Sequence, residues 1–258
     1  MARPSFDLSQ EVDLKVKWHN EIQEKAWDGI DCPHCLNRGT IAEASVEHGV
    51  KYLYLRQCRC MIQRKINTML EKSGLGQMIQ SYTLDNYQPI EPWQVTIKKT
   101  AMSYISGAYK AYWFYIGGKV GSGKSHICTA ITSEIIKKGN EGIYIRWRDF
   151  LHQIKAVMNT DEYETIMKFY RRVPVLYIDD FLQGDGKPTQ ADMNIAYELI
   201  DYRYTNIKTT IFSSEWALSN VIELMEGLGS RIKQLCEDFS ITVANDDSRN
   251  QRYKKRGK

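Results

Sequence analysis

The sequence lacks the features that would attach a chain to a membrane or export it. No stretch approaches the roughly 20 consecutive apolar residues that span a bilayer. The first ten residues contain no apolar segment of the kind found in a signal peptide. Internal repeats and low-complexity tracts are also absent. We therefore expect a cytoplasmic protein with no membrane partner.

Net charge is also small. The chain has 35 Lys and Arg residues against 31 Asp and Glu, a formal charge of +4 over 258 residues. This excess permits an anionic partner but does not identify one. Most of it can be assigned to a basic C-terminal tail that contains Arg249, Arg252, Lys254, Lys255, Arg256 and Lys258. Hydrophobic residues make up 43% of the chain, which is ample for a core.

Cysteines are few and unevenly placed. Six in a chain of this length exclude a small disulfide scaffold, yet four of them lie within residues 32–60. Cys32 and Cys35 form a C-x-x-C pair, and Cys58 and Cys60 supply a second pair after 22 intervening residues. Two close pairs of thiolates suit a tetrahedral Zn²⁺ ion. Because this segment is too short to bury a sufficient core, we expect the metal to fix its fold.

A redox role for Cys32-Pro33-His34-Cys35 is the alternative to zinc. Thiol oxidoreductases place such a motif at the start of a helix that follows a strand, and residues 1–31 show no strand pattern. Structural zinc is therefore the favoured interpretation. His34 and His48 are spare candidate ligands, and we expect His34 to point outward.

Strand and helix patterns alternate in the second half of the chain. Strand patterns cover residues 112–116, 142–147, 173–178, 209–213 and 239–244, with helical patterns between them. This alternation predicts an α/β fold with a parallel five-stranded sheet and helices on both faces. We expect three parts. They are an N-terminal helix and zinc-binding domain over 1–75, a linker over 76–92 and the large domain over 93–258.

A phosphate-binding pattern follows the first of these strands. Gly118–Ser125 matches G-x-x-x-x-G-K-[ST], and a helical pattern follows it. Glycines let backbone N–H groups converge on phosphate oxygens, while Lys124 would reach the β- and γ-phosphates and Ser125 would bind Mg²⁺. A chance glycine-rich turn is the alternative. The expected nucleotide-binding residues are Gly118, Gly121, Ser122, Gly123, Lys124 and Ser125.

Two adjacent acids end the apolar run Val175–Ile178. Strand ends of a parallel sheet meet at the edge where ligands of α/β proteins lie. Asp179 would join the magnesium site, and Asp180 would orient or deprotonate the attacking water. The alternative is a strand end followed by an ordinary solvated turn.

Together these motifs resemble the helicase-loader branch of the AAA+ ATPases. That branch holds the DnaC/DnaI type and its phage counterparts, and the transposition helper IstB is close kin. The resemblance covers about residues 80–258, and the cysteine-bearing N-terminal segment matches the DnaI-type and phage-type loaders. It implies ATP or ADP, self-association through AAA+ interfaces, contact with single-stranded DNA, and delivery of a replicative DnaB-type hexameric helicase.

Further site residues come from this resemblance. Gly229-Ser230-Arg231 resembles the box that carries an arginine finger, so Arg231 would enter the nucleotide site of a neighbouring subunit; a surface arginine is the alternative. The sensor 1 strand of the family usually ends in Asn, where this chain has Glu215. Ser214 is the candidate replacement, and weak hydrolysis is the other outcome. Arg252 resembles a terminal nucleotide-contacting arginine, with a solvated tail as the alternative.

Nucleic-acid binding and hydrolysis are the open points. Basic and aromatic residues alternate over Tyr163–Arg172, which suits stacking on bases, but a helix with its aromatics turned to the core is the competing interpretation. The second function class is an IstB-like transposition helper, or an adaptor that binds ATP with little hydrolysis. The cysteine cluster favours the loader function, whereas Glu215 leaves the adaptor function as an alternative.

Overall fold

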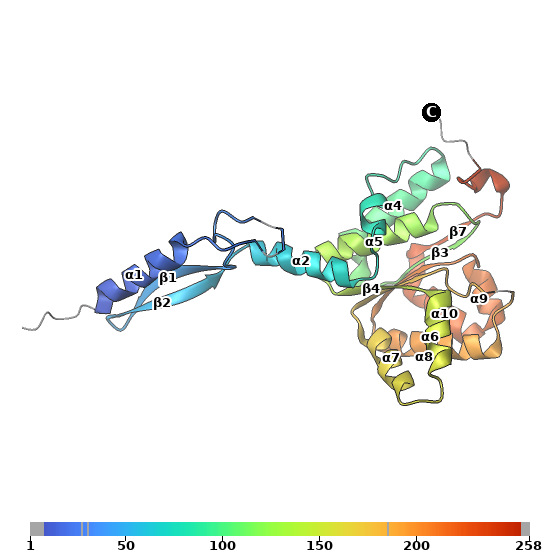
Figure 1. The fold of residues 1–258 in the computed structure, drawn as a ribbon. Coiled ribbons are helices and arrows are strands. Elements are labelled where there is room, and N and C mark those ends of the chain that lie inside the picture. Colours follow the sequence, from blue (N-terminus) through green and yellow to red (C-terminus); the bar gives the residue numbers. More distant parts are fainter. Residues whose placement is uncertain (1–7, 27, 30, 185, 254–258) are drawn as a thin grey trace, which may run out of the picture. The chain divides into compact units, whose positions relative to one another are not determined.

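The computed structural model describes residues 8–26, 28–29, 31–184 and 186–253. The chain divides into two compact units, Met1–Thr68 and Met69–Lys258 (Figure 1). Some residues named above lie outside the described ranges. These are Lys254, Lys255, Arg256 and Lys258 of the basic tail.

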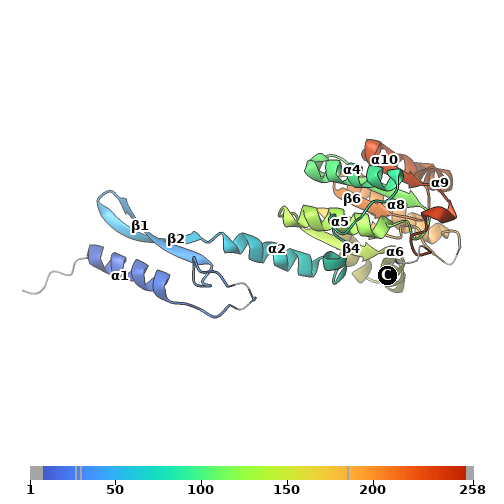
Figure 2. The same ribbon diagram turned by 90° about the horizontal axis from the view of Figure 1, so that it is seen from above.

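The first unit combines a helix with a β-hairpin. Helix α1 (Leu8–Glu21) lies along strands β1 (Thr40–Glu47) and β2 (Val50–Gln57), as Figures 1 and 2 show. The Asn20 amide and the Ala42 backbone exchange two hydrogen bonds of 2.9 Å, which fix the helix to the hairpin. Helix α2 (Cys60–Lys72) begins in this unit and continues beyond Thr68.

Strand β1 was not predicted from the sequence. Its residues include Ala42, Glu43 and Ala44, which favour strands weakly, so local composition does not announce it. Pairing with β2 and cover from α1 stabilise it instead. The turn at His48 and Gly49 has φ values of 50° and 78°, as a tight hairpin requires.

The second unit is an α/β domain. Its described strands form one parallel sheet in the order β4-β5-β6-β3-β7, which confirms the predicted α/β class with a five-stranded parallel sheet. The strands are β3 (Phe114–Gly118), β4 (Gly142–Arg146), β5 (Val175–Asp179), β6 (Thr209–Ser213) and β7 (Ser240–Val243). The helices are α3 (Met78–Ser81), α4 (Pro92–Ser106), α5 (Lys124–Lys137), α6 (Trp147–Ala156), α7 (Glu162–Arg172), α8 (Gln190–Thr205), α9 (Leu218–Leu224) and α10 (Glu226–Cys236).

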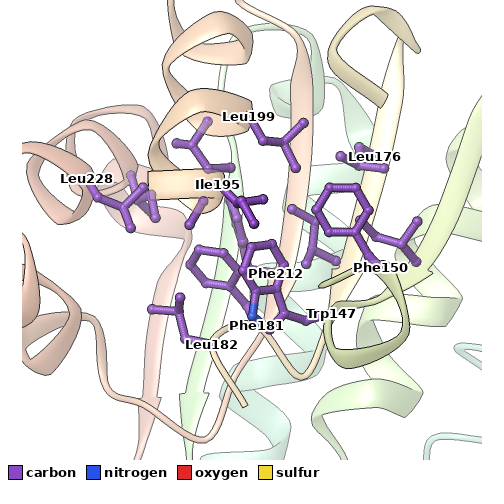
Figure 3. Close-up of a cluster of buried hydrophobic side chains, with 14 of the residues drawn as sticks. Trp147, Phe150, Leu176, Phe181, Leu182, Ile195, Leu199, Phe212 and Leu228 are labelled. Atoms are coloured by element: carbon purple, nitrogen blue, oxygen red, sulfur yellow. The ribbon is translucent and has the colours of Figure 1, made fainter. Parts of the chain in front are cut away.

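Hydrophobic side chains cover both faces of this sheet. Helices α4 and α5 pack on one face, and α6, α8 and α10 bury the other. Figure 3 shows the cluster beneath α6, α8 and α10, in which the Phe181 ring packs against the rings of Trp147 and Phe212. The ring centroids of these pairs are 5.0 and 5.1 Å apart, a typical aromatic packing distance. A rigid sheet therefore supports the loops at its carboxyl edge.

Residues 76–92, which the sequence predicts as a linker, lie within the second unit. Tyr87 is buried in the same cluster as α4 and α5, and so is the neighbouring Leu75. The Tyr144 backbone N–H on the edge strand β4 donates to the Ser73 carbonyl at 2.6 Å. No helix in the described part of the chain combines the length and apolar character needed to cross a membrane.

Candidate nucleotide site and metal centre

The loop from Gly118 to Ser125 joins β3 to α5 at the carboxyl edge of the sheet. Gly121 and Gly123 have φ values of +73° and +89°, a conformation that glycine adopts without strain. The Lys124 ammonium donates to the carbonyl oxygens of Gly118 and Lys119 at 2.9 and 2.8 Å. Lys124 is buried, and burial lowers its pKa while the carboxylates of Glu215 and Asp180 oppose this shift. The loop and its lysine thus have the arrangement that a phosphate site needs.

Asp179 collects four hydroxyl donors. Ser125 and Tyr177 donate to its Oδ1 at 2.9 and 2.7 Å, and Ser213 donates to the same oxygen. Tyr144 donates to Oδ2 at 3.3 Å. These side chains come from α5, β4, β5 and β6, so the carboxylate is held from several elements at once. The sequence motifs identified only Asp179 and Ser125 of this group.

Ser125 and Asp179 fit an Mg²⁺ ion. A hydroxyl and a carboxylate are hard oxygen ligands, and the structure brings them within hydrogen-bonding distance beside the phosphate loop. When bound there, Mg²⁺ would neutralise charge on the β- and γ-phosphates. Tyr177 and Ser213 would keep the Asp179 carboxylate in place through their hydrogen bonds.

Asp180 occupies the turn that follows β5. Its φ of 53° is unusual for a residue with a side chain, and its backbone N–H donates to Ser213 Oγ at 3.1 Å. Burial and the neighbouring Asp179 raise the pKa of the Asp180 carboxyl, while Arg146, 3.9 Å away, lowers it. A raised pKa brings a carboxylate closer to the basicity required of a general base.

Glu215 adds a third carboxylate near this turn. It follows β6, is exposed, and accepts a hydrogen bond of 2.9 Å from the Gln183 amide. Its charge raises the pKa values of both Lys124 and Asp180. A negative side chain so close to these residues opposes the build-up of charge on a γ-phosphate.

We expect Glu215→Asn to increase ATP turnover by at least about tenfold, because an amide replaces a repelling charge with a possible donor. Removing the Glu215 charge also lowers the pKa of Asp180, so the acid limb of the pH–rate profile should move to lower pH. Steady-state turnover from acid to neutral pH measures both effects. Glu223→Asn, at an exposed position on α9, is the matched control. Unchanged turnover and an unmoved acid limb would contradict the role given to Glu215.

An aromatic cluster beside the phosphate loop was not recognised in the sequence. His126 stacks on Tyr82 at 4.9 Å, meets the edge of Tyr87 at 5.3 Å, and donates to the Thr83 carbonyl at 2.8 Å. The Tyr87 ring lies 3.4 Å from the place that a Cβ of Gly123 would take. Within the described residues, the buried Tyr87 hydroxyl has no hydrogen-bond partner, and burial raises its pKa to about 12. Flat apolar rings with one spare polar group suit a planar base.

The C-terminal segment packs on the phosphate loop. The Gln251 backbone N–H donates to the Gly121 carbonyl at 2.9 Å, and the buried Asn250 fills the space beside Gly121. Asp247 forms an ion pair with Lys119. Arg252 follows directly and has an exposed side chain. The predicted proximity of Arg252 to the nucleotide therefore depends on this segment, whose Asn250 contact the sequence did not indicate.

Ser214 and Arg231 have partners inside the protein. Ser214 is buried, and its hydroxyl donates to the Phe181 carbonyl at 2.7 Å, whereas its neighbour Ser213 faces Asp179. Arg231, on α10, contacts the Asp201 carboxylate at 2.9 Å and lies over the rings of two tyrosines of α8. The roles suggested for Ser214 and Arg231 by resemblance remain predictions.

The four clustered cysteines form a compact group in the first unit. Their Sγ atoms all lie within 4.8 Å of one another. The Cys32–Cys58 and Cys35–Cys60 sulfur distances are 3.8 and 3.5 Å. A tetrahedral Zn²⁺ with Zn–S bonds near 2.3 Å places its sulfur atoms about 3.8 Å apart. The donor set and its spacing therefore fit zinc.

Asn37 shapes the first half of this metal centre. It is buried with a φ of 71°, a left-handed conformation that Asn tolerates. Its Oδ1 accepts from the Cys32 backbone N–H at 2.8 Å, and its amide donates to the Glu24 carbonyl and to Asp31. Backbone N–H groups of Cys35 and His34 point at the Cys32 sulfur and lower the pKa of that thiol to about 7. His34 and His48 are exposed.

The chain is similar to several bacterial proteins. The chain is 30% identical over 209 residues to the uncharacterized protein YqaM of Bacillus subtilis strain 168, covering 76% of this chain and 66% of YqaM. It is 25% identical over 202 residues to the replicative helicase loader DnaC of Escherichia coli K12, covering 76% and 74% of the two chains. The chain thus spans slightly less than two thirds of YqaM.

The fold is also similar to that of a solved helicase loader. The crystal structure of the DnaC helicase loader superposes with a TM-score of 0.54 at 22% identity, covering 65% of this chain and 98% of that one. This likeness agrees with the predicted α/β fold. The model of the IstB-like ATP binding protein family matches residues 34–228, which include the phosphate loop, Asp179 and Asp180. With its phosphate loop, paired acids and this match over most of its length, the chain belongs to the IstB-like ATP-binding proteins.

Proposed function

We propose that this protein is an ATP-dependent loader that binds a replicative DnaB-type hexameric helicase and delivers it to single-stranded DNA during replication initiation. The observation that carries the proposal is the phosphate loop facing Asp179, in a chain similar to the DnaC loader along 76% of its length. Partners of this kind place the protein in the cytoplasm.

Nucleotide chemistry follows from the residues around the loop. Lys124 would contact the β- and γ-phosphates, and Ser125 with Asp179 would hold Mg²⁺. Asp180 would accept a proton from, or orient, the attacking water. Arg231 would stabilise transition-state charge in the site of a neighbouring subunit after release from Asp201. This last step requires self-association through the AAA+ domain.

An IstB-like transposition helper or a nucleotide-binding adaptor is the second candidate function, and Glu215 favours it. ATP turnover measured with and without single-stranded DNA separates the two. A loader should hydrolyse ATP, and DNA should change its rate. ATP binding with no measurable turnover under either condition would support the adaptor instead.

The first unit would grip the helicase. Zinc would hold its short chain together, and the outer face of the hairpin presents the exposed side chains of Val50, Tyr52 and Tyr54. Exposed aromatic residues on a rigid strand are typical of protein interfaces. Retention of a hexameric helicase from host extract by the zinc-loaded protein tests this assignment. Retention that survives deletion of residues 1–68 would contradict it.

Helix α7 offers the best-supported contact for single-stranded DNA. Tyr163 donates to Glu198 at 2.6 Å and Tyr170 packs on Phe150, so these two aromatics face the protein. Phe169 is instead 53% exposed, and it borders a hollow with Lys168 and Arg172. An exposed ring between two cations suits a base stacked on the ring and phosphates on the cations.

We expect Phe169→Ala to weaken binding of an oligodeoxythymidine strand about tenfold, because one base loses its stacking partner. Fluorescence anisotropy at fixed salt measures the affinity. Tyr253→Ala removes another exposed ring, far along the chain in the C-terminal segment, and should leave the affinity unchanged. Equal losses in the two variants would contradict a DNA contact on α7.

A further inference from the structure

Arg64 is a buried cation beside the cysteine cluster. It lies on α2, one turn after Cys60, and its residue is only 2% exposed. Arginine is almost never buried to this extent unless its charge is paired, since removing an ion from water is costly. The side chains around Arg64 therefore indicate the role of its buried charge.

Two side chains lie beside the Arg64 guanidinium. Asp28, in the segment before the first cysteine pair, forms an ion pair with one of its terminal nitrogens. Cys60 lies one helical turn before Arg64 on α2, which places its side chain beside the guanidinium. A planar guanidinium with five N–H donors can serve both partners at once, which a lysine ammonium does less well.

Another sulfur of the cluster accepts a hydrogen bond. The Gly39 backbone N–H donates to Cys35 Sγ at 3.3 Å. A divalent metal with four thiolates carries excess negative charge, and the burial of Cys32, Cys35 and Cys58 keeps water from solvating it. Such a site requires hydrogen-bond donors to sulfur, and Arg64 places a positive charge beside Cys60.

We propose that Arg64 is a positioning residue of the metal centre, which holds the Cys60 side chain in place as a ligand of Zn²⁺ while Asp28 orients the guanidinium. The inference rests on the proposed zinc site. It extends that site outward from Cys60 to the Arg64 guanidinium and then to the Asp28 carboxylate. Such outer partners fix the orientation of metal ligands and usually matter 10- to 100-fold for affinity.

This arrangement ties the metal to the start of α2. Cys60 is the first residue of that helix, and Arg64 follows four positions later on the same side. Loss of the metal would leave the Arg64 charge with Asp28 as its anionic partner and remove the tie at Cys60. The first turn of α2 should then be the part of the helix that responds to zinc.

Zinc affinity of the full-length protein tests the proposal. We expect Arg64→Met to bind zinc 10- to 100-fold more weakly in competition with a chromogenic chelator. Arg64→Lys should lose less zinc affinity, because lysine keeps the positive charge but lacks the planar set of guanidinium N–H donors. The control is Arg59→Met, an exposed arginine between Cys58 and Cys60, which should bind zinc like the wild type. The intensity of the thiolate-to-cobalt bands in Co²⁺-substituted protein gives an independent readout of Cys60 ligation.

A second variant separates this role from simple loss of folding. Asp28→Asn leaves the cysteines and Arg64 in place and should weaken zinc binding by a smaller factor. Retained ATP binding reports that the second unit is intact in each variant. Wild-type zinc affinity and full cobalt bands in Arg64→Met would overturn the proposal. So would a wild-type protein that binds no zinc, and that result would leave the nucleotide site untouched.

Discussion

Replacement of Lys124 by alanine should abolish nucleotide-dependent behaviour. The buried Lys124 ammonium donates to the carbonyls of Gly118 and Lys119 in the phosphate loop, and it would contact the phosphates of a bound nucleotide. Loss of a charged hydrogen bond weakens binding by up to about 3 kcal/mol, or roughly 100-fold in affinity. Turnover should fall further, by about 10³, because the lysine also stabilises charge in the transition state.

Titration with a fluorescent ATP analogue and steady-state turnover measure these two losses. Lys137→Ala is the matched control. It removes a lysine from the same helix at an exposed position paired only with Glu134 among the contacts of the described residues, and both quantities should stay unchanged. Wild-type ATP affinity in Lys124→Ala would sink the assignment of the phosphate loop.

The largest effect on stability is expected at Arg203. This residue of α8 is fully buried, and burial lowers its pKa to about 9, so that it is still charged at neutral pH. Its guanidinium donates to Thr210 Oγ1 and to backbone carbonyls of Val173 and Thr209. Tyr170 and Arg171 supply two further carbonyls at the end of α7. Arg203 therefore joins α7, α8 and the start of β6.

Arg203→Met keeps an unbranched apolar side chain at this position and leaves these carbonyls buried without their donor. We expect the free energy of unfolding to fall by about 3–5 kcal/mol, and the melting temperature to drop by about 2–4 °C per kcal/mol. Urea titration followed by circular dichroism measures the change. Arg252→Met, at an exposed position, should change stability by less than about 0.5 kcal/mol. A melting curve equal to that of the wild type would contradict the bridging role of Arg203.

Sequence motifs could predict those parts of the site whose residues lie close together in the chain. The phosphate loop, the two acids after β5 and the two cysteine pairs each lie within a few residues, so their chemistry is visible without the fold. The strand and helix alternation was equally local, and it predicted the parallel sheet. Strand β1 was not predicted, because its stability comes from its partner strand and from α1.

Other site residues depend on strand register and helix phase. Ser213 reaches Asp179 because the parallel register pairs Ile178 of β5 with Phe212 of β6, so that the next residue of each strand lies side by side. Tyr144 reaches it because its strand pairs residue for residue with β5. On α7, the rotation of the helix decides that Phe169 faces solvent while Tyr170 faces the core. Pattern alone fixes neither quantity, so these residues became visible only in the fold.

Long-range contacts explain the remaining differences. Arg64 and Asp28 are ordinary polar residues in the sequence, and only folding of the cysteine segment brings them together. Asn250 lies 129 positions from Gly121 in the chain, yet it packs against that glycine. The compact-unit division at Thr68 and Met69 likewise falls inside α2, where the sequence shows no break in its helical pattern.

Helicase loading onto a closed circle of single-stranded DNA tests the central claim most directly. The host's hexameric helicase, the zinc-loaded protein and ATP would be mixed with the circle, and DNA-bound helicase would be counted after gel filtration. The proposed function predicts helicase on the circle with the wild-type protein and ATP, and little with Lys124→Ala. Equal loading in the absence of this protein, or with Lys124→Ala in its place, would contradict it.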